Sequence, residues 1–156
     1  MGNRLFTDGS VCRQEEYGGW AFILETDEEL IQASGALLPK CDANQMELEA
    51  LEHGLRALPH GPCDVQLYCD SLHVRDVLKA LFRHAKPSKK ATPSIVVRNG
   101  ILTRALPELI RDRRIHFHQV FPDADDCEEQ HRRCHALSRE ARERFVERIR
   151  DSKYAD

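Results

Sequence analysis

Three β-like runs precede the first helical pattern of this chain, and their order limits the sheet that it can form. A short apolar run covers residues 5–7, and longer runs follow at 18–24 and 30–37, with a polar turn at 26–29 between these two. Apolar runs of this kind joined by short connections are typical of antiparallel strands. We therefore expect an antiparallel meander at the start of the chain.

Helical and strand patterns alternate after residue 37. In chain order they are a helix at about 44–58, a strand at 65–70, a helix after the capping residue Ser71, a weaker helical pattern at 97–111, a strand at 115–121 and a last helix at about 128–150. Helices that alternate with single strands indicate a sheet covered by helices. The order predicts an α/β fold with a central five-stranded mixed sheet, its first three strands antiparallel, flanked by helices.

The length and composition of the chain are those of one ordinary domain. With 156 residues, we expect residues 1–156 to form a single domain. No apolar run approaches the ~20 residues of a membrane helix, and the N-terminus lacks the pattern of a secretory signal. The six cysteines are irregularly spaced and include no CxxC pair, which favours reduced thiols. We therefore expect a cytoplasmic monomer without a membrane partner.

Charge is distributed unevenly along the chain. Between Val77 and Pro107 there are seven basic residues and no acidic residue, although the net charge of the whole chain is -3. The remainder is therefore strongly acidic. A basic segment on an acidic body suits a polyanionic ligand such as a nucleic acid, but a solvated helix and loop would have the same composition.

Two aspartates occupy matching positions in the pattern. Asp8 and Asp70 each end an apolar strand, so their carboxylates would meet at one edge of the sheet if the two strands were neighbours. Glu47 borders the apolar stripe of the first helix on the side that faces the sheet, whereas Glu49 and Glu52 are predicted to point outward. We therefore expect three acids, Asp8, Glu47 and Asp70, to reach the same place.

A cluster of three carboxylates indicates a divalent cation. Without a cation, the charges would repel one another or force protonation. Oxygen ligands suit Mg²⁺ or Mn²⁺, and two such ions about 4 Å apart are the usual arrangement for displacement at a phosphodiester. Each acid also has an ordinary interpretation: Asp8 as a turn former with Gly9 and Ser10, Glu47 as a surface acid, and Asp70 as the start of a helix. The shared position of the three acids favours the metal site.

Four motifs of this sequence resemble, in the same order, the blocks of the type 1 ribonuclease H family. They are TDGS at 7–10 followed by GGWAFIL, NQMELEAL at 44–51, LYCDSLHV at 67–74, and RRCHALSREA at 132–141. The resemblance covers nearly the whole chain. It implies the ribonuclease H-like fold and endonucleolytic cleavage of the RNA strand of RNA/DNA hybrids with two Mg²⁺ or Mn²⁺ ions, giving 5′-phosphate and 3′-hydroxyl ends. It also implies that Asp8, Glu47 and Asp70 are catalytic metal ligands.

The resemblance further implies a set of hybrid-binding residues. They are Gly9, Ser10 and Asn44, which match positions that approach the hybrid backbone in the family, and Lys86, Lys89 and Lys90, which would hold DNA phosphates. The lysine segment lacks the tryptophans that the family often carries in its basic protrusion. We therefore expect weak, salt-sensitive binding of the hybrid.

The sequence departs from the family at the fourth ligand, where His135 stands in place of an aspartate. A neutral imidazole binds divalent ions, and Mn²⁺ accepts nitrogen more readily than Mg²⁺. We therefore expect His135 to be a catalytic metal ligand, Mn²⁺ to be the better activator, and activity to fall below about pH 6.5, where histidine becomes protonated.

Other interpretations of this region remain open. One of the loop acids Asp123, Asp125 and Asp126 could supply a fourth carboxylate. Zinc could bind among Cys127, His131, Cys134 and His135, although Cys134 belongs to the apolar stripe of the last helix. His131 could instead be the proton-transfer histidine that the family carries in this loop.

Two further functions remain open beside the ribonuclease. The replacement of aspartate by histidine could have silenced catalysis and left a nucleic-acid-binding module. The same fold could also serve a structure-specific DNA nuclease, because a fold does not fix the substrate. Retention of Asp8, Glu47 and Asp70 favours an enzyme, since a binding module needs no cluster of acids.

Overall fold

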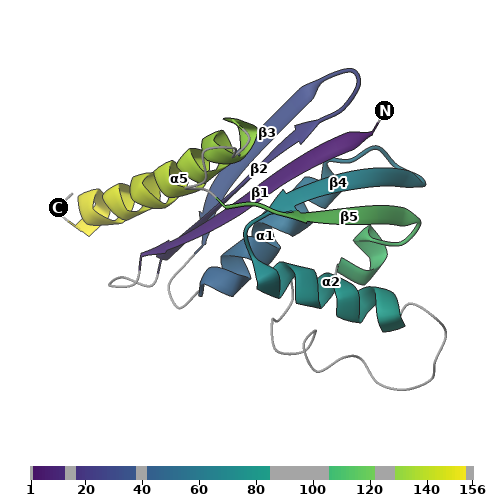
Figure 1. The fold of residues 1–156 in the computed structure, drawn as a ribbon. Helices are drawn as coiled ribbons and strands as arrows, with labels where there is room; N and C mark the ends of the chain where they lie inside the picture. Colours follow the sequence, from purple (N-terminus) through teal and green to yellow (C-terminus); the bar gives the residue numbers. More distant parts are fainter. Residues whose placement is uncertain (1, 13–16, 38–41, 85–105, 122–128, 154–156) are drawn as a thin grey trace.

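The computed structural model describes residues 2–12, 17–37, 42–84, 106–121 and 129–153. Its strands are β1 (Asn3–Cys12), β2 (Tyr17–Glu25), β3 (Leu30–Leu37), β4 (Cys63–Cys69) and β5 (Arg113–Gln119), and its helices are α1 (Ala43–Arg56), α2 (Leu72–His84) and α5 (Glu129–Lys153). The strands form one sheet in the order β3-β2-β1-β4-β5 (Figure 1). β1, β2 and β3 pair antiparallel, whereas β4 pairs parallel to both β1 and β5. The predicted mixed five-stranded sheet with helices is confirmed.

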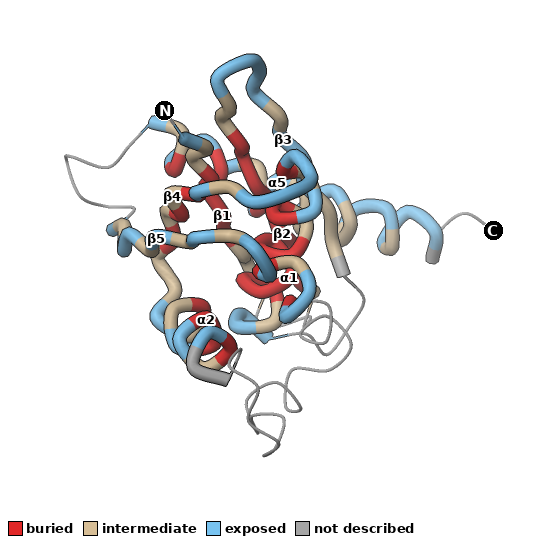
Figure 2. The backbone as a smooth tube through the Cα atoms, turned by 90° about the vertical axis from the view of Figure 1, so that its right-hand side faces the viewer, coloured by how far each residue is buried: buried red, intermediate tan, exposed pale blue. Residues whose placement is uncertain are grey.

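The two faces of the sheet are covered by different helices. Side chains of a strand alternate between faces, so Leu5 of β1 packs against Gly54 of α1, whereas the next residue, Phe6, packs in a cluster with Cys134 of α5. Figure 1 shows α5 along β1, β2 and β3, and α1 and α2 on the other face. The buried residues concentrate in β1, β2 and α1, while the C-terminal part of α5 extends into solvent (Figure 2).

The helix starts follow from local hydrogen bonds. The Asp42 side chain accepts a hydrogen bond of 2.7 Å from the backbone N–H of Gln45, which caps α1. Ser71 caps α2 in the same way, since its hydroxyl accepts from the Val74 N–H at 3.3 Å. The cap predicted at Ser71 is therefore confirmed. Within the described parts of the chain, no helix combines the length and the apolar character needed to span a bilayer.

The predicted end of the first strand is wrong. β1 does not turn at Asp8, Gly9 and Ser10 but continues to Cys12, because these residues keep their antiparallel pairing with β2. Asp-Gly is a common turn signal, and here the ladder to β2 overrides it. Asp8 therefore lies inside a strand and is buried.

The outward orientation predicted for Glu49 and Glu52 is also wrong, because each side chain is only 7% exposed. Glu49 lies 2.9 Å from the His53 Nε2 atom, and Glu52 accepts a hydrogen bond of 2.6 Å from Arg56. The His53 ring in turn stacks on Trp20 of β2. The partner one helical turn further along thus compensates the charge of each glutamate and covers it.

Smaller corrections concern the last third of the chain. β5 ends at Gln119, so Phe121 lies outside the sheet and is 60% exposed. Of the helix predicted at 97–111, the described residues contain only the part at 106–109, and residues 85–105 lie outside the described parts. Leu106 and Ile110 belong to the core. The last helix is confirmed, with bounds that differ by a few residues from the predicted ones.

Gly9 is the point of closest approach between β1 and α1. A Cβ atom at this position would lie 2.7 Å from the backbone N of Glu47 and 2.7 Å from the backbone C of Met46. We predict that Gly9→Ala destabilises the fold by about 1–3 kcal/mol, because two backbone segments would have to separate. Chemical denaturation measures the change. Gly2→Ala is the matched control, since its Cβ would meet nothing closer than 4.0 Å. Equal midpoints for the two variants would contradict this close packing.

Candidate metal centre

β1 and β4 separate at one end of their parallel ladder. The last paired residues are Phe6 and Tyr68, after which β1 continues beside β2 alone. Asp8 and Asp70 stand two residues beyond this last pair, Asp8 within β1 and Asp70 directly after β4. We call this place the fork, defined by Asp8 and Asp70.

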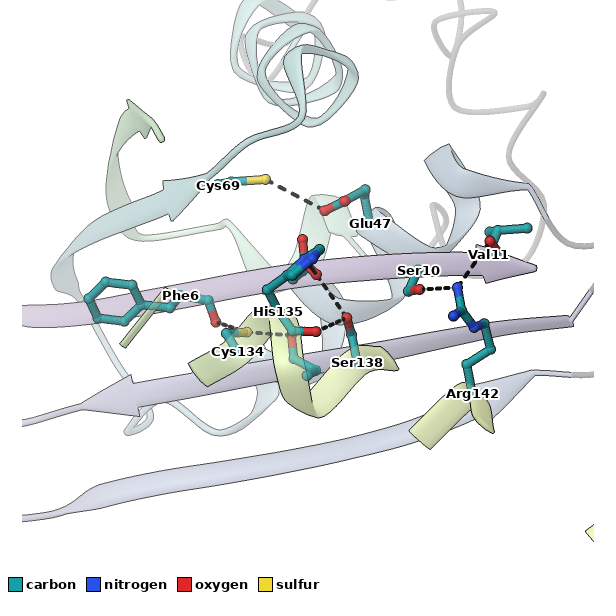
Figure 3. Close-up of polar contacts among 11 residues, drawn as sticks. Phe6, Ser10, Val11, Glu47, Cys69, Cys134, His135, Ser138 and Arg142 are labelled. Carbon is teal, nitrogen blue, oxygen red and sulfur yellow. Dashed lines mark hydrogen bonds and ion pairs between the residues drawn. The ribbon is translucent and has the colours of Figure 1, made fainter. Parts of the chain in front are cut away.

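Asp8 is held by α5. The carboxylate is 1% exposed, and its Oδ2 atom accepts a hydrogen bond of 2.8 Å from the Ser138 hydroxyl and lies 2.9 Å from His135 Nδ1. Figure 3 shows His135 and Ser138 together on α5, where the Ser138 hydroxyl also donates to the His135 carbonyl at 2.9 Å. The second oxygen, Oδ1, is buried and has no hydrogen-bond partner among the described residues. An unsatisfied carboxylate oxygen in the interior is costly. This oxygen is therefore available for a ligand from outside the chain.

Glu47 reaches the fork from α1. Burial is the largest cause that raises the pKa of Glu47 well above its usual range, and repulsion from Asp8 and Asp70 raises it further. The Cys69 thiol donates a weak hydrogen bond of 3.8 Å to its Oε2 atom. Burial and then the charge of Asp8 also raise the pKa of Asp70. The three predicted acids do lie together: Asp8 and Asp70 disfavour the charged form of Glu47, and Asp8 disfavours that of Asp70.

Two histidines of α5 face the same cluster. His135 is half-buried, and its pKa is raised, first of all by the hydrogen bond to Asp8. His131, one helical turn earlier, is fully buried, and burial lowers its pKa. Neither ring nitrogen of His131 has a hydrogen-bond partner in the described parts of the chain. A solvent-exposed, mobile position, as the proton-transfer interpretation of His131 requires, is not what the structure shows.

The arrangement fits a divalent cation. Two groups of three residues have possible ligand atoms within 4.8 Å of one another: Asp8 with Asp70 and His131, and Glu47 with Cys69 and Asp70. Clustered carboxylates with raised pKa values and an unsatisfied Asp8 oxygen lack positive charge, which a dication would supply. Asp70 belongs to both groups, so a cation bound at one group would also change the electrostatic environment of the other.

The predicted hybrid-binding residues lie in different environments. Asn44 is exposed on the first turn of α1, while Gly9 lies under α1 in β1. The Ser10 hydroxyl accepts a hydrogen bond of 2.6 Å from Arg142 of α5, which also donates to the Val11 carbonyl. The lysines predicted to hold phosphates, Lys86, Lys89 and Lys90, lie outside the described residues.

The alternatives for the fourth ligand are only partly visible. The loop acids Asp123, Asp125 and Asp126 and the cysteine at 127 lie outside the described residues. The Cys134 thiol donates to the backbone carbonyls of Phe6 and Ala21 at 3.5 and 3.3 Å, so it points into the sheet. Cys134 therefore does not join His131 and His135 around a common zinc.

Two residues of the cluster were not assigned to it from the sequence. His131 entered only as a zinc or proton-transfer candidate, although its position four residues before His135 places both rings on one face of α5. Cys69 precedes Asp70 in the strand predicted at 65–70 and was given no role beyond that of a reduced thiol. The contact of its thiol with the Glu47 carboxylate follows from the way α1 packs on the sheet, which the sequence does not show.

Comparisons with known proteins agree with this fold. The family model described as RNase H matches residues 2–143. A ribonuclease H of Agrobacterium fabrum is 32% identical over 145 residues, which cover 92% of this chain and 97% of the relative. A ribonuclease H of Rhodopirellula baltica is 35% identical over 122 residues, covering 74% of this chain and 76% of the relative.

Solved structures share the fold at low sequence identity. The N-terminal RNase H domain of a Mycobacterium tuberculosis protein has a TM-score of 0.64 at 16% identity, covering 94% of this chain and 97% of that chain. LC11-RNase H1, solved in complex with an RNA/DNA hybrid, has a TM-score of 0.62 at 14% identity, covering 92% and 99%. The fold is thus the ribonuclease H-like α/β fold. The sequence matches show that the chain belongs to the RNase H family.

The raised pKa of Glu47 predicts how the metal-free protein responds to pH. A folded-state pKa above the ordinary value of 4.5 gives stability that is present below this value and is lost as pH rises through the folded pKa. Glu47→Gln keeps the side chain neutral. We expect it to raise the Tm in the presence of a chelator near pH 7, by roughly 2–4 °C for each kcal/mol of repulsion removed.

Thermal unfolding between about pH 4 and pH 7 measures this effect, which should shrink towards the acid end as wild-type Glu47 becomes protonated. The control is Glu28→Gln, which changes an exposed glutamate far from the fork. A Tm for Glu47→Gln below that of the wild type near pH 7 would contradict the repulsion inferred at the fork.

Proposed function

We propose that this protein is an endoribonuclease that hydrolyses the RNA strand of RNA/DNA hybrids. Membership of the RNase H family supports the proposal, as do relatives named ribonuclease H and the hybrid-bound structure of LC11-RNase H1. The observation that carries it is the fork, where Asp8, Glu47 and Asp70 meet and one oxygen of Asp8 has no partner among the described residues. A module that only bound nucleic acid would gain nothing from buried acids that repel one another.

We assign the metal ligands of this enzyme to Asp8, Glu47, Asp70 and His135, with Mg²⁺ or Mn²⁺ as the cofactor and two ions per site. Bound dications would supply an activated water and stabilise the charge on the leaving 3′ oxygen, giving 5′-phosphate and 3′-hydroxyl products. Ser138 keeps the Asp8 carboxylate in position through its hydrogen bond. The His135 side chain, which contacts the same carboxylate, is 39% exposed, whereas that of Asp8 is 1% exposed.

We assign hybrid binding to the residues around the fork. Asn44 is exposed on the first turn of α1, and Arg142 fixes Ser10 in β1 through a hydrogen bond. Lys86, Lys89 and Lys90 would add contacts to DNA phosphates, which makes binding salt-sensitive. We further propose that residues 1–156 act as a single domain, as a cytoplasmic monomer.

The contact between His135 and Asp8 sets up a competition for the carboxylate. When the imidazole is protonated, it forms an ion pair with Asp8 Oδ2 and leaves no lone pair for a metal. When the imidazole is neutral, a dication can take both side chains as ligands. Proton and metal therefore exclude each other at this pair.

The first test is cleavage of a labelled hybrid in Mg²⁺ and in Mn²⁺. We expect the wild type to cut the RNA strand, with Mn²⁺ the better activator, and Asp8→Asn to lose at least about a thousandfold in rate, since it removes a charged ligand of the reacting site. His135→Ala should be strongly impaired, whereas His135→Asp should keep or raise activity. Ser152→Ala, at the far end of α5, is a control that should cut like the wild type.

Other outcomes of the same assay favour the competing functions. Cleavage only after aspartate is restored at position 135 would identify a hybrid-binding module with a silenced nuclease site. Preferential cleavage of branched DNA would identify a structure-specific DNA nuclease. Full activity in His135→Ala would contradict the role of His135 as a ligand.

The pKa of His135 predicts the acid limb of the pH profile. Because the hydrogen bond to Asp8 raises this pKa above the ordinary value of 6.5, protonation begins to block metal binding at a higher pH than for a free histidine. Activity should therefore decline as pH falls through this raised value. In His135→Asp the acid limb should move to lower pH. A kcat/KM profile with an unchanged acid limb in His135→Asp would contradict the competition.

A further inference from the structure

His131 is a buried histidine whose ring nitrogens make no hydrogen bond to any described residue. It is 0% exposed on the inner face of α5, and neither Nδ1 nor Nε2 has a hydrogen-bond partner among the residues that the structure describes. Buried polar side chains in folded proteins nearly always have at least one partner, because leaving one unsatisfied lowers the stability of the fold. A bound species that accepts the imidazole lone pair would remove this cost.

The place to which His131 points is the fork. A ring nitrogen of His131 and carboxylate oxygens of Asp8 and Asp70 all lie within 4.8 Å of one another. The three groups come from α5, from β1 and from the end of β4, so they surround a common point from different sides. Asp8, a member of this group, also has an oxygen, Oδ1, with no hydrogen-bond partner in the described part of the chain.

We propose that His131 is an additional metal ligand of this site, which completes a three-sided group with Asp8 and Asp70. The proposal rests on the proposed function, in which the fork binds divalent cations. The proposal adds a ring nitrogen of His131 to the ligands already assigned, which are Asp8, Glu47, Asp70 and His135. His131 and His135 are four residues apart on α5, a spacing that places two imidazoles on the same face of a helix.

A second imidazole changes which cation the fork selects. Mg²⁺ prefers oxygen ligands, whereas Mn²⁺ and the later divalent transition metals accept imidazole nitrogen. With two histidines the fork is a mixed nitrogen and oxygen site. We therefore infer a stronger preference for Mn²⁺ over Mg²⁺ than His135 alone would give.

The deciding experiment uses Mn²⁺ as a spin probe in the full chain. Electron spin echo spectroscopy detects imidazole nitrogen bound directly to Mn²⁺, independently of activity. The His135→Asp variant is the informative sample, because it removes one imidazole without touching His131. We expect its Mn²⁺ to retain an imidazole signal, weaker than in the wild type, and we expect this signal to disappear in the double variant His135→Asp with His131→Gln.

The possible failures are distinguishable. If Mn²⁺ binds to His135→Asp without any imidazole signal, His131 is not a ligand, and the metal site of the proposed function stands. If neither the wild type nor His135→Asp binds Mn²⁺, the metal site itself is wrong and the role of His131 falls with it. An imidazole signal that persists in the double variant would come from another histidine and would also overturn the proposal.

Affinity gives an independent readout on single variants. His131→Gln should weaken Mn²⁺ binding about tenfold or more, at least as much as the loss of a residue that supports a ligand. It should also lower the ratio of Mn²⁺ affinity to Mg²⁺ affinity. His116→Gln is the matched control, because His116 lies on β5 beside Asp64 and should leave the affinity unchanged. Circular dichroism verifies folding of each variant. Equal Mn²⁺ affinities for the two variants would contradict the proposal.

Discussion

Repulsion among buried carboxylates is the constraint on which this site depends. Asp8, Glu47 and Asp70 converge at the point where β1 leaves β4, where the charges of Asp8 and Asp70 raise the pKa of Glu47 and the charge of Asp8 raises the pKa of Asp70. Two side chains of α5, His135 and Ser138, partly offset this repulsion because both contact the Oδ2 atom of Asp8. The other oxygen and the nearby imidazole of His131 stay without partners among the described residues. A bound cation would relieve the repulsion that this concentration of negative charge creates.

The sheet supplies the geometry of this concentration. Parallel pairing of β1 with β4 brings Asp8 and Asp70 to the same end, and the continued ladder to β2 keeps Asp8 inside a rigid strand. Gly9 then lets α1 approach β1 closely enough for Glu47 to arrive from the opposite face. The three acids thus come from elements whose positions the core determines. Rigid placement is what a site for in-line phosphoryl chemistry requires.

Much of this arrangement was predictable, and the failures have physical reasons. The order of strands and helices along the chain followed from apolar periodicity. The meeting of Asp8 with Asp70 was predicted on the condition that their strands are neighbours, and the pairing of β1 with β4 meets this condition. The turn predicted at Gly9 failed because pairing with β2 outweighs local turn preference. Glu49 and Glu52 turned out buried, since partners at the next helical turn compensate their charges. The role inferred for His131 could not be predicted from the sequence. Helical spacing places it on the same face as His135, but only the structure shows that its ring nitrogens have no partner among the described residues.

The most direct test of the account is anomalous X-ray diffraction from crystals of the wild-type protein grown with Mn²⁺. The account predicts an anomalous peak at the fork, in contact with the Asp8 oxygen that has no partner among the described residues and with Asp70, and with the ion pair between His135 and Asp8 broken. An empty fork at millimolar Mn²⁺, with His135 still bound to Asp8, would contradict the claim that these acids are gathered to hold a cation.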